Sequence, residues 1–72
     1  MTAYLVGAKT AATPMDRGAM MVYLIEAKDK PDALAAVQKK VPRNWTVEDV
    51  LGTADPKLVG LHRPRLHIPE QL

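Results

Sequence analysis

The sequence has 72 residues, 47% of them hydrophobic, and a formal net charge of +2. That length makes one domain rather than two, and that hydrophobic content is too high for a disordered chain. The absence of cysteine excludes a disulfide framework and a thiolate metal site. The small positive charge is far from the strong excess that is typical of a dedicated nucleic-acid-binding protein.

The sequence also lacks the usual signals for export or membrane insertion. The N-terminal stretch has no basic region followed by a long apolar core, and no segment approaches the roughly 20 apolar residues that cross a membrane. We therefore expect a cytoplasmic protein that does not enter a membrane. A chain this small buries only roughly 60% of the surface that its unfolded form exposes. Its stability should be marginal, and association between copies is the remaining way to increase it.

Two apolar segments near the N-terminus predict a pair of strands. Residues 2–9 (TAYLVGAK) are apolar on both sides, with Gly7 as a weak point or bulge. Residues 19–27 (AMMVYLIEA) are rich in residues that favour strands, and turn-like residues flank them. We expect the two strands to pair antiparallel across the loop of residues 10–18, which is long for a hairpin connection.

The second of these strands has a consequence for assembly. Side chains alternate between the two faces of a strand, and both sets are apolar here until Glu26. The strand should therefore be covered on both faces and paired on both edges, because a strand with one wet face alternates apolar and polar residues. One helix covers only one face. We expect a homodimer or higher oligomer, with the interface formed by Leu5, Met20, Val22 and Leu24.

Residues 32–41 (DALAAVQKKV) predict an amphipathic helix that follows a short charged turn. Pro31 suits the first turn, and Asp29 or Asp32 can cap the N-terminus or favour it by charge. Pro42 ends the helix. The apolar face is formed by Leu34, Val37 and Val41.

Residues 45–51 (WTVEDVL) fit two structures. As a half-exposed strand, the segment places on one face Trp45, Val47 and Leu51. The run from Thr46 to Asp49 also resembles a capping box that would begin a helix ending at Gly52. We favour the strand, because a third strand gives a sheet an independent stability that two strands rarely have.

The remaining sequence predicts a short helix and a tail. Asp55 is a cap, Pro56 suits a first helical turn and Gly60 is a stop. The tail of residues 61–72 contains two prolines and no helical period, so it should be extended. We predict a single α+β domain with a folded core of residues 1–60. Its order is ββαβ, with an antiparallel sheet, one main helix, a short C-terminal helical turn and the extended tail.

Basic side chains form two groups that could contact nucleic acid: Lys39, Lys40 and Arg43 in the first, and Arg63 and Arg65 in the second. The first group lies beside Trp45, which could stack on a base. The two arginines would share one face of an extended chain and could hold a phosphate. Simpler interpretations also fit, since lysines commonly end a helix, a tryptophan commonly anchors a core, and charges keep a tail soluble.

Residues suited to metal binding or catalysis are few. His62 and His67 lie five residues apart in a segment that contains proline, without further ligands of matching type, so we expect no metal and no other cofactor. Glu26 ends a buried strand, and a part-buried carboxylate can act as a general base. No phosphate loop, nucleophile elbow or metal-binding helix motif is present.

The sequence therefore favours a small non-enzymatic protein that acts as a self-associating protein-interaction module, or that docks on another protein. An accessory nucleic-acid-binding protein that uses the two basic groups is the alternative. An enzyme whose pocket forms between subunits is a third possibility, and it would need Glu26 or a tail histidine in that pocket.

Overall fold

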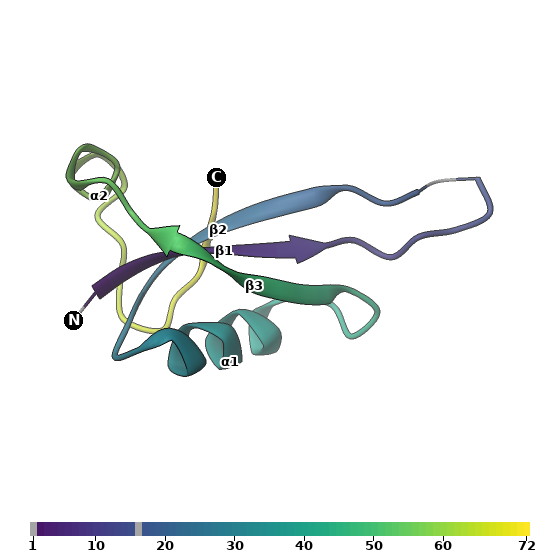
Figure 1. Ribbon diagram of the computed structural model, residues 1–72, viewed down its shortest axis with the longest axis horizontal. Coiled ribbons are helices and arrows are strands. Elements are labelled where there is room, and N and C mark those ends of the chain that lie inside the picture. The colour runs from purple at the N-terminus through teal and green to yellow at the C-terminus, as the bar shows by residue number, and fades with distance from the viewer. Residues whose placement is uncertain (1, 16) are drawn as a thin grey trace.

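The computed structural model describes residues 2–15 and 17–72, and it contains a four-stranded antiparallel sheet with two helices (Figure 1). The elements in chain order are β1 (Thr2–Lys9), β2 (Met20–Ala27), α1 (Lys30–Lys40), β3 (Thr46–Thr53), α2 (Pro56–His62) and β4 (Glu70–Gln71). Across the sheet the strands lie in the order β3-β1-β2-β4. Helix α1 covers one face, and α2 stands on the opposite side, near the end where the chain begins (Figure 1). The predicted α+β fold is confirmed.

Strands β1 and β2 form the predicted hairpin, in a regular register from Thr2 opposite Ala27 to Lys9 opposite Met20. The connection projects beyond the sheet as an arm (Figure 1). At the base of this arm the Thr10 amide donates to the Ala19 carbonyl at 2.9 Å. Gly18 is required there, because its φ is +82° and a methyl group on it would lie 2.7 Å from the Thr10 carbonyl oxygen.

Both candidate caps contribute to the start of α1. The Asp29 carboxylate accepts a hydrogen bond from the Asp32 amide at 2.9 Å, and the Asp32 carboxylate accepts one from the Lys28 amide at 3.0 Å. The helix then presents an apolar face to the sheet, where Ala33, Val37 and Val41 are buried and Leu34 is half-buried.

The core lies between α1 and the sheet. Alternate residues of the first two strands enter it: Tyr4, Val6, Ala8, Tyr23, Ile25 and Ala27. The residues between them in sequence face the other side of the sheet. Pro42 follows the helix, and Trp45 packs against the edge of the core, as a half-buried anchor.

Residues 46–53 form a strand, so the helical alternative for this segment is wrong. β3 pairs with β1, and two bulges shift its register, between Leu5 and Val6 and between Gly7 and Ala8 of β1. Each bulge adds a residue and so changes which side chains face the core. Val50 consequently joins Val47 against the core. The prediction that Leu51 shares the face of Trp45 and Val47 is wrong, because Leu51 lies on the opposite face over Gly7.

The C-terminal third differs from the prediction in two respects. Gly60 does not end α2, which continues to His62 and is closed by Arg63 in the left-handed conformation (φ 49°). The tail then adds a fourth strand, β4, which pairs with β2 along the edge that β1 does not use. In this pairing Glu70 lies opposite Leu24. The expectation that β2 is paired on both edges is confirmed. No helix in the described part of the chain is long and apolar enough to cross a membrane.

Candidate functional site

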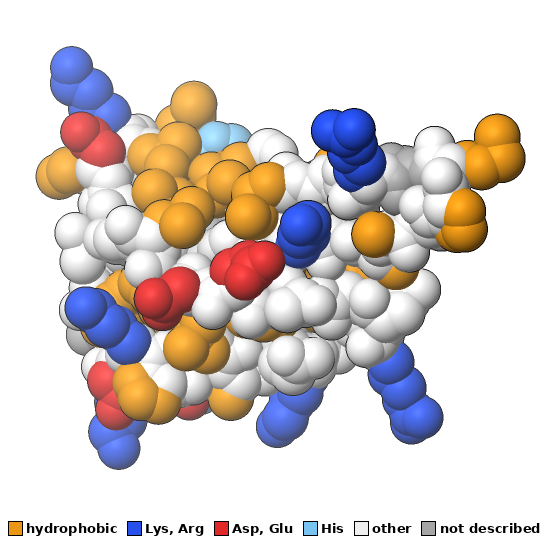
Figure 2. All heavy atoms as spheres, turned by 45° about the vertical axis from the view of Figure 1, so that its right-hand side comes forward, with side chains coloured by type: hydrophobic (Ala, Val, Ile, Leu, Met, Phe, Trp, Pro, Cys, Tyr) orange, Lys and Arg blue, Asp and Glu red, His pale blue; other side chains and the backbone are white. Residues whose placement is uncertain are grey.

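The face of the sheet opposite α1 carries an exposed apolar surface, here named the open patch, which consists of Leu5, Met20, Val22 and Leu51. Met20 and Leu51 are 54% and 58% exposed, while Leu5 and Val22 are half-buried. A methyl group on Gly7 would lie 3.3 Å from Met20 Sδ and 3.4 Å from Leu51 Cδ2, so both side chains lie over Gly7 of β1. Figure 2 shows hydrophobic side chains gathered on the side of the molecule away from α1.

Of the four predicted interface residues, Leu24 is not accessible. It lies on the same face as Val22, outside the core under α1, yet it is fully buried. Because α1 covers the other face, the cover over Leu24 comes from the chain that follows β3, including the tail that pairs along β2. The second face is therefore covered by the chain itself at one end and open at the other, where Met20 lies.

Charges of both signs border the open patch. Lys9 ends β1 on the same face, and it forms no ion pair with any described residue. Asp49 lies opposite Gly7 on β3, and its carboxylate accepts the amide of Val50 at 2.7 Å. Figure 2 likewise shows basic and acidic side chains beside the hydrophobic group. A partner with either acidic or basic side chains can therefore find an opposite charge at the border of the patch.

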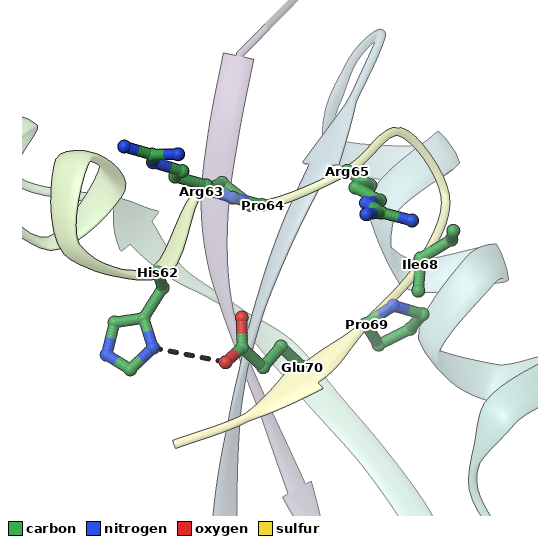
Figure 3. Close-up of a pocket in the computed structure, with 7 residues that line it drawn as sticks. All are labelled: His62, Arg63, Pro64, Arg65, Ile68, Pro69 and Glu70. Atoms are coloured by element: carbon green, nitrogen blue, oxygen red, sulfur yellow. Dashed lines mark hydrogen bonds and ion pairs between the residues drawn. The ribbon is translucent and has the colours of Figure 1, made fainter.

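The two tail histidines each contact a different carboxylate. His62 Nδ1 lies 3.1 Å from Glu70 Oε1 (Figure 3), and His67 Nε2 lies 2.5 Å from Asp32 Oδ2. The hydrogen bond from the Lys28 amide, followed by that from His67, holds the pKa of Asp32 below its usual value. Within residues 2–15 and 17–72 no three potential metal ligands converge.

The predicted basic groups do not form one surface. Arg63 and Arg65 point in different directions (Figure 3), so the expectation that they share a face is wrong. The reason is the left-handed conformation of Arg63, which breaks the alternation of an extended chain. Both arginines line an open hollow of about 570 Å³ in the bend of the tail.

Of the other basic group, Lys39 lines a smaller hollow of about 210 Å³ together with Asp32 and His67. Lys40 and Arg43 are exposed and line none of the described hollows beside the tail. None of the five predicted basic residues forms an ion pair with a described residue.

Glu26 borders a third hollow, of about 500 Å³, between the start of β1 and α2. Its side chain is half-buried, and its main-chain carbonyl accepts the His67 amide at 2.9 Å. It is the one acidic or basic side chain among the described residues that line this hollow. No second titratable group faces Glu26 there to share a proton transfer, so the arrangement supplies no acid–base pair.

Comparison with known proteins adds no relative, since no family model, no curated protein and no solved structure matches the chain. Two features of the surface were not predicted: the carboxylate partners of the histidines and the position of Leu51. No local sequence pattern predicts either feature, because bulges set the position of Leu51 and left-handed residues set the path of the tail that carries the histidines.

Proposed function

We propose that the protein is a self-associating, non-enzymatic interaction module, and that a second copy of the chain docks on the open patch. The position of Met20 and Leu51 over Gly7 carries this proposal. Two large apolar side chains from different strands are more than half exposed there, on a sheet whose other face carries the buried core. Grouped exposed apolar residues are typical of protein interaction sites.

The charges beside the patch favour a second copy over an unrelated partner. In a symmetric dimer the same surface meets itself, so a border of one sign would repel its counterpart. Lys9 and Asp49 give the open patch one charge of each sign. Lys9 of one copy can therefore approach Asp49 of the other, and the reverse contact forms by symmetry.

The size of the molecule supports the same choice. A stable interface buries about 800 Å² on each partner, and the accessible surface of the chain is 5035 Å². About one sixth of the surface is therefore needed, which is more than the four residues of the open patch supply. The contact therefore extends beyond these four residues, and Leu72, whose amide donates to the Val22 carbonyl, is 45% exposed beside them. A second copy offers a surface of the same size and shape.

Sedimentation velocity between about 1 and 100 µM tests the proposal, because this range covers dimers whose free energy of association is about −8 to −5.5 kcal/mol. The wild-type chain is expected to sediment as a dimer at the upper end, and Leu51→Lys is expected to shift it to a monomer. Met15→Lys is the matched control, because Met15 is 98% exposed in the arm and lies outside the open patch. A wild-type monomer at all concentrations, or equal loss of the dimer in both variants, would contradict the proposal.

The same preparations test the nucleic-acid alternative. Titration with single-stranded and duplex oligonucleotides at low salt should show no binding by a module that only self-associates. Binding that falls steeply with salt, and that is weakened by Arg63→Ala together with Arg65→Ala, would instead support the alternative.

A further inference from the structure

The surroundings of Glu26 set it apart from the other described carboxylates. Most of those accept a backbone amide or contact a histidine: Asp29, Asp32, Asp49, Asp55 and Glu70. Glu48 has no such partner among the described residues, but it is exposed to water. Glu26 also has no side-chain partner among them, although it is half-buried. Carboxylates withdrawn from water are ordinarily paired, so this position favours a positive charge from outside the chain.

The Glu26 carboxylate remains accessible from the hollow of about 500 Å³ that it lines, here named the Glu26 hollow. In the described part of the chain, no side-chain oxygen or nitrogen of a half-buried or buried residue is both sealed from water and unpaired. The unpaired oxygens of Glu26 are therefore not sealed, and a ligand in the hollow can reach them.

Small side chains lie beside Glu26 on the sheet. Ala3 of β1 is directly opposite Glu26 of β2, so the two side chains are neighbours on the face away from α1. The Ala54 amide donates to the Ala3 carbonyl at 2.9 Å, which places the residue after β3 next to them. Both alanines end at a methyl group. They therefore give the Glu26 hollow an apolar floor without filling the space above it.

Helix α2 forms the other wall, through Pro56, Val59 and Gly60. It stands near the end of the sheet where the chain begins (Figure 1). A methyl group on Gly60 would meet no heavy atom within 4 Å, so nothing packs against the helix at that position. Thr2 and Thr53 also line the hollow and carry hydroxyl groups. The hollow thus combines an apolar wall, hydroxyl groups and one carboxylate.

No described basic residue compensates the charge of Glu26 in the hollow. Lys28 and Lys57 are near it in sequence or on α2, but both are exposed and neither lines it. A single negative charge attracts a cation and repels an anion. A metal ion would need further ligands, and within residues 2–15 and 17–72 no three potential metal ligands converge. The lining therefore fits a cation that is itself apolar over most of its length.

We infer that the Glu26 hollow binds a primary alkylammonium group. Its N–H groups donate to the Glu26 carboxylate and to a threonine hydroxyl, and its chain lies along Ala3, Ala54 and Val59. A small free amine and a lysine side chain of another protein both carry this group. None of the lining residues belongs to the open patch, so this inference does not depend on the proposed dimer.

NMR titration of the ¹⁵N-labelled chain with n-butylammonium chloride tests the inference, at constant ionic strength and at pH 7, where carboxylates and amines are both charged. The amide signals of Ala3, Ala54 and Val59 should shift and saturate, with a dissociation constant on the order of 10 mM for one ion pair at a half-exposed site. Glu26→Gln should weaken binding about fivefold. Glu48→Gln is the matched control, because it removes the same charge outside the hollow.

Three further ligands separate the parts of the group. 1-Butanol lacks the charge and ammonium chloride lacks the chain, so both should bind more weakly than n-butylammonium. Nα-acetyl-lysine methylamide carries the same ammonium and chain on a peptide backbone. Shifts of the same amides with this ligand assign the hollow to a lysine side chain as well as to free amines, and their absence restricts it to free amines.

Urea denaturation supplies a readout without ligand. Glu26→Gln keeps the size of the side chain and removes an unpaired charge, so the urea midpoint should stay the same or rise. A clearly lower midpoint would mean that Glu26 already has a partner within the chain, which overturns the inference. The inference also fails if n-butylammonium gives no saturating shift up to about 100 mM, if 1-butanol binds equally well, or if Glu26→Gln and Glu48→Gln have the same effect.

Discussion

The two faces of the sheet differ in how they are covered. On the face toward α1, side chains at regular spacing from the helix and from two strands form a closed core, with Val6, Ile25 and Val37 fully buried. On the other face, Leu24 is buried by the chain itself, while Met20 and Leu51 remain more than half exposed. Both faces are apolar, so composition alone does not distinguish them.

This difference separates stability from association. A residue on the closed face contributes by burial within one chain, and its removal leaves a cavity. A residue of the open patch contributes little within one chain, and its apolar surface becomes useful only when a second copy covers it. Substitutions on the two faces should therefore affect different measurements.

The largest effect should come from the closed face. Ile25→Ala is expected to lower the free energy of unfolding by about 2–5 kcal/mol, because it removes a fully buried side chain beneath α1. Leu51→Ala should change it by less than about 0.5 kcal/mol in the monomer. Urea denaturation at a concentration where the chain is monomeric checks both values. Comparable losses from the two substitutions would show that the faces do not differ as described.

Helix capping should show the same difference on a smaller scale. Asp29→Ala removes the hydrogen bond to the Asp32 amide and should lower the free energy of unfolding by about 1 kcal/mol, since α1 covers the core. Asp55→Ala removes the corresponding bond to the Lys57 amide in α2, which has no buried residue. Its effect on global unfolding should be smaller, and amide exchange should show fraying confined to α2. If Asp55→Ala lowered the free energy of global unfolding more than Asp29→Ala, the claim that α1 and not α2 supports the core would be wrong.

The smallest effect concerns acid stability at the contact between α1 and the tail. The lowered pKa of Asp32 means that the folded state binds a proton less readily than the unfolded state there. Its contribution is therefore complete above the unfolded pKa, near 4, and is lost as the pH falls through the folded value. Wild type should exceed Asp32→Asn in stability at pH 6, and the difference should narrow toward pH 2.5. If the stability difference between wild type and Asp32→Asn grew as the pH fell, the pKa of Asp32 would not be lowered in the folded state.

Much of the fold is predictable because its signals are local. The apolar runs of β1 and β2 predict strands by themselves. The capping residues and Pro31 predict the start of α1 in the same way. The apolar character of β2 on both faces indicates correctly that it needs pairing on both edges. The limits appear where geometry is not local. The two bulges in β3 move Leu51 to the opposite face, and no short pattern in its sequence specifies where they occur.

The candidate site shows the same limit. Met20 and Val22 are identified by alternation alone, because β2 is regular. Leu24 is assigned to the correct face, but its cover depends on the path of the tail, which is set by the left-handed residues Arg63 and His67. Left-handed turns at residues other than glycine leave little trace in composition. The pairing of His67 with Asp32 joins residues 35 positions apart and cannot be seen in either segment.

Methionine methyl groups provide the most direct test of the docking of a second copy on the open patch. Met20 lies in the patch, Met21 packs against the core under α1, and Met15 lies in the arm. Their methyl signals, assigned with single Met→Leu substitutions, can be followed by NMR across a dilution series. We predict that the Met20 signal shifts or broadens with concentration while those of Met15 and Met21 stay constant. A Met20 signal that does not respond to concentration, or a response confined to Met15, would contradict a contact at the open patch.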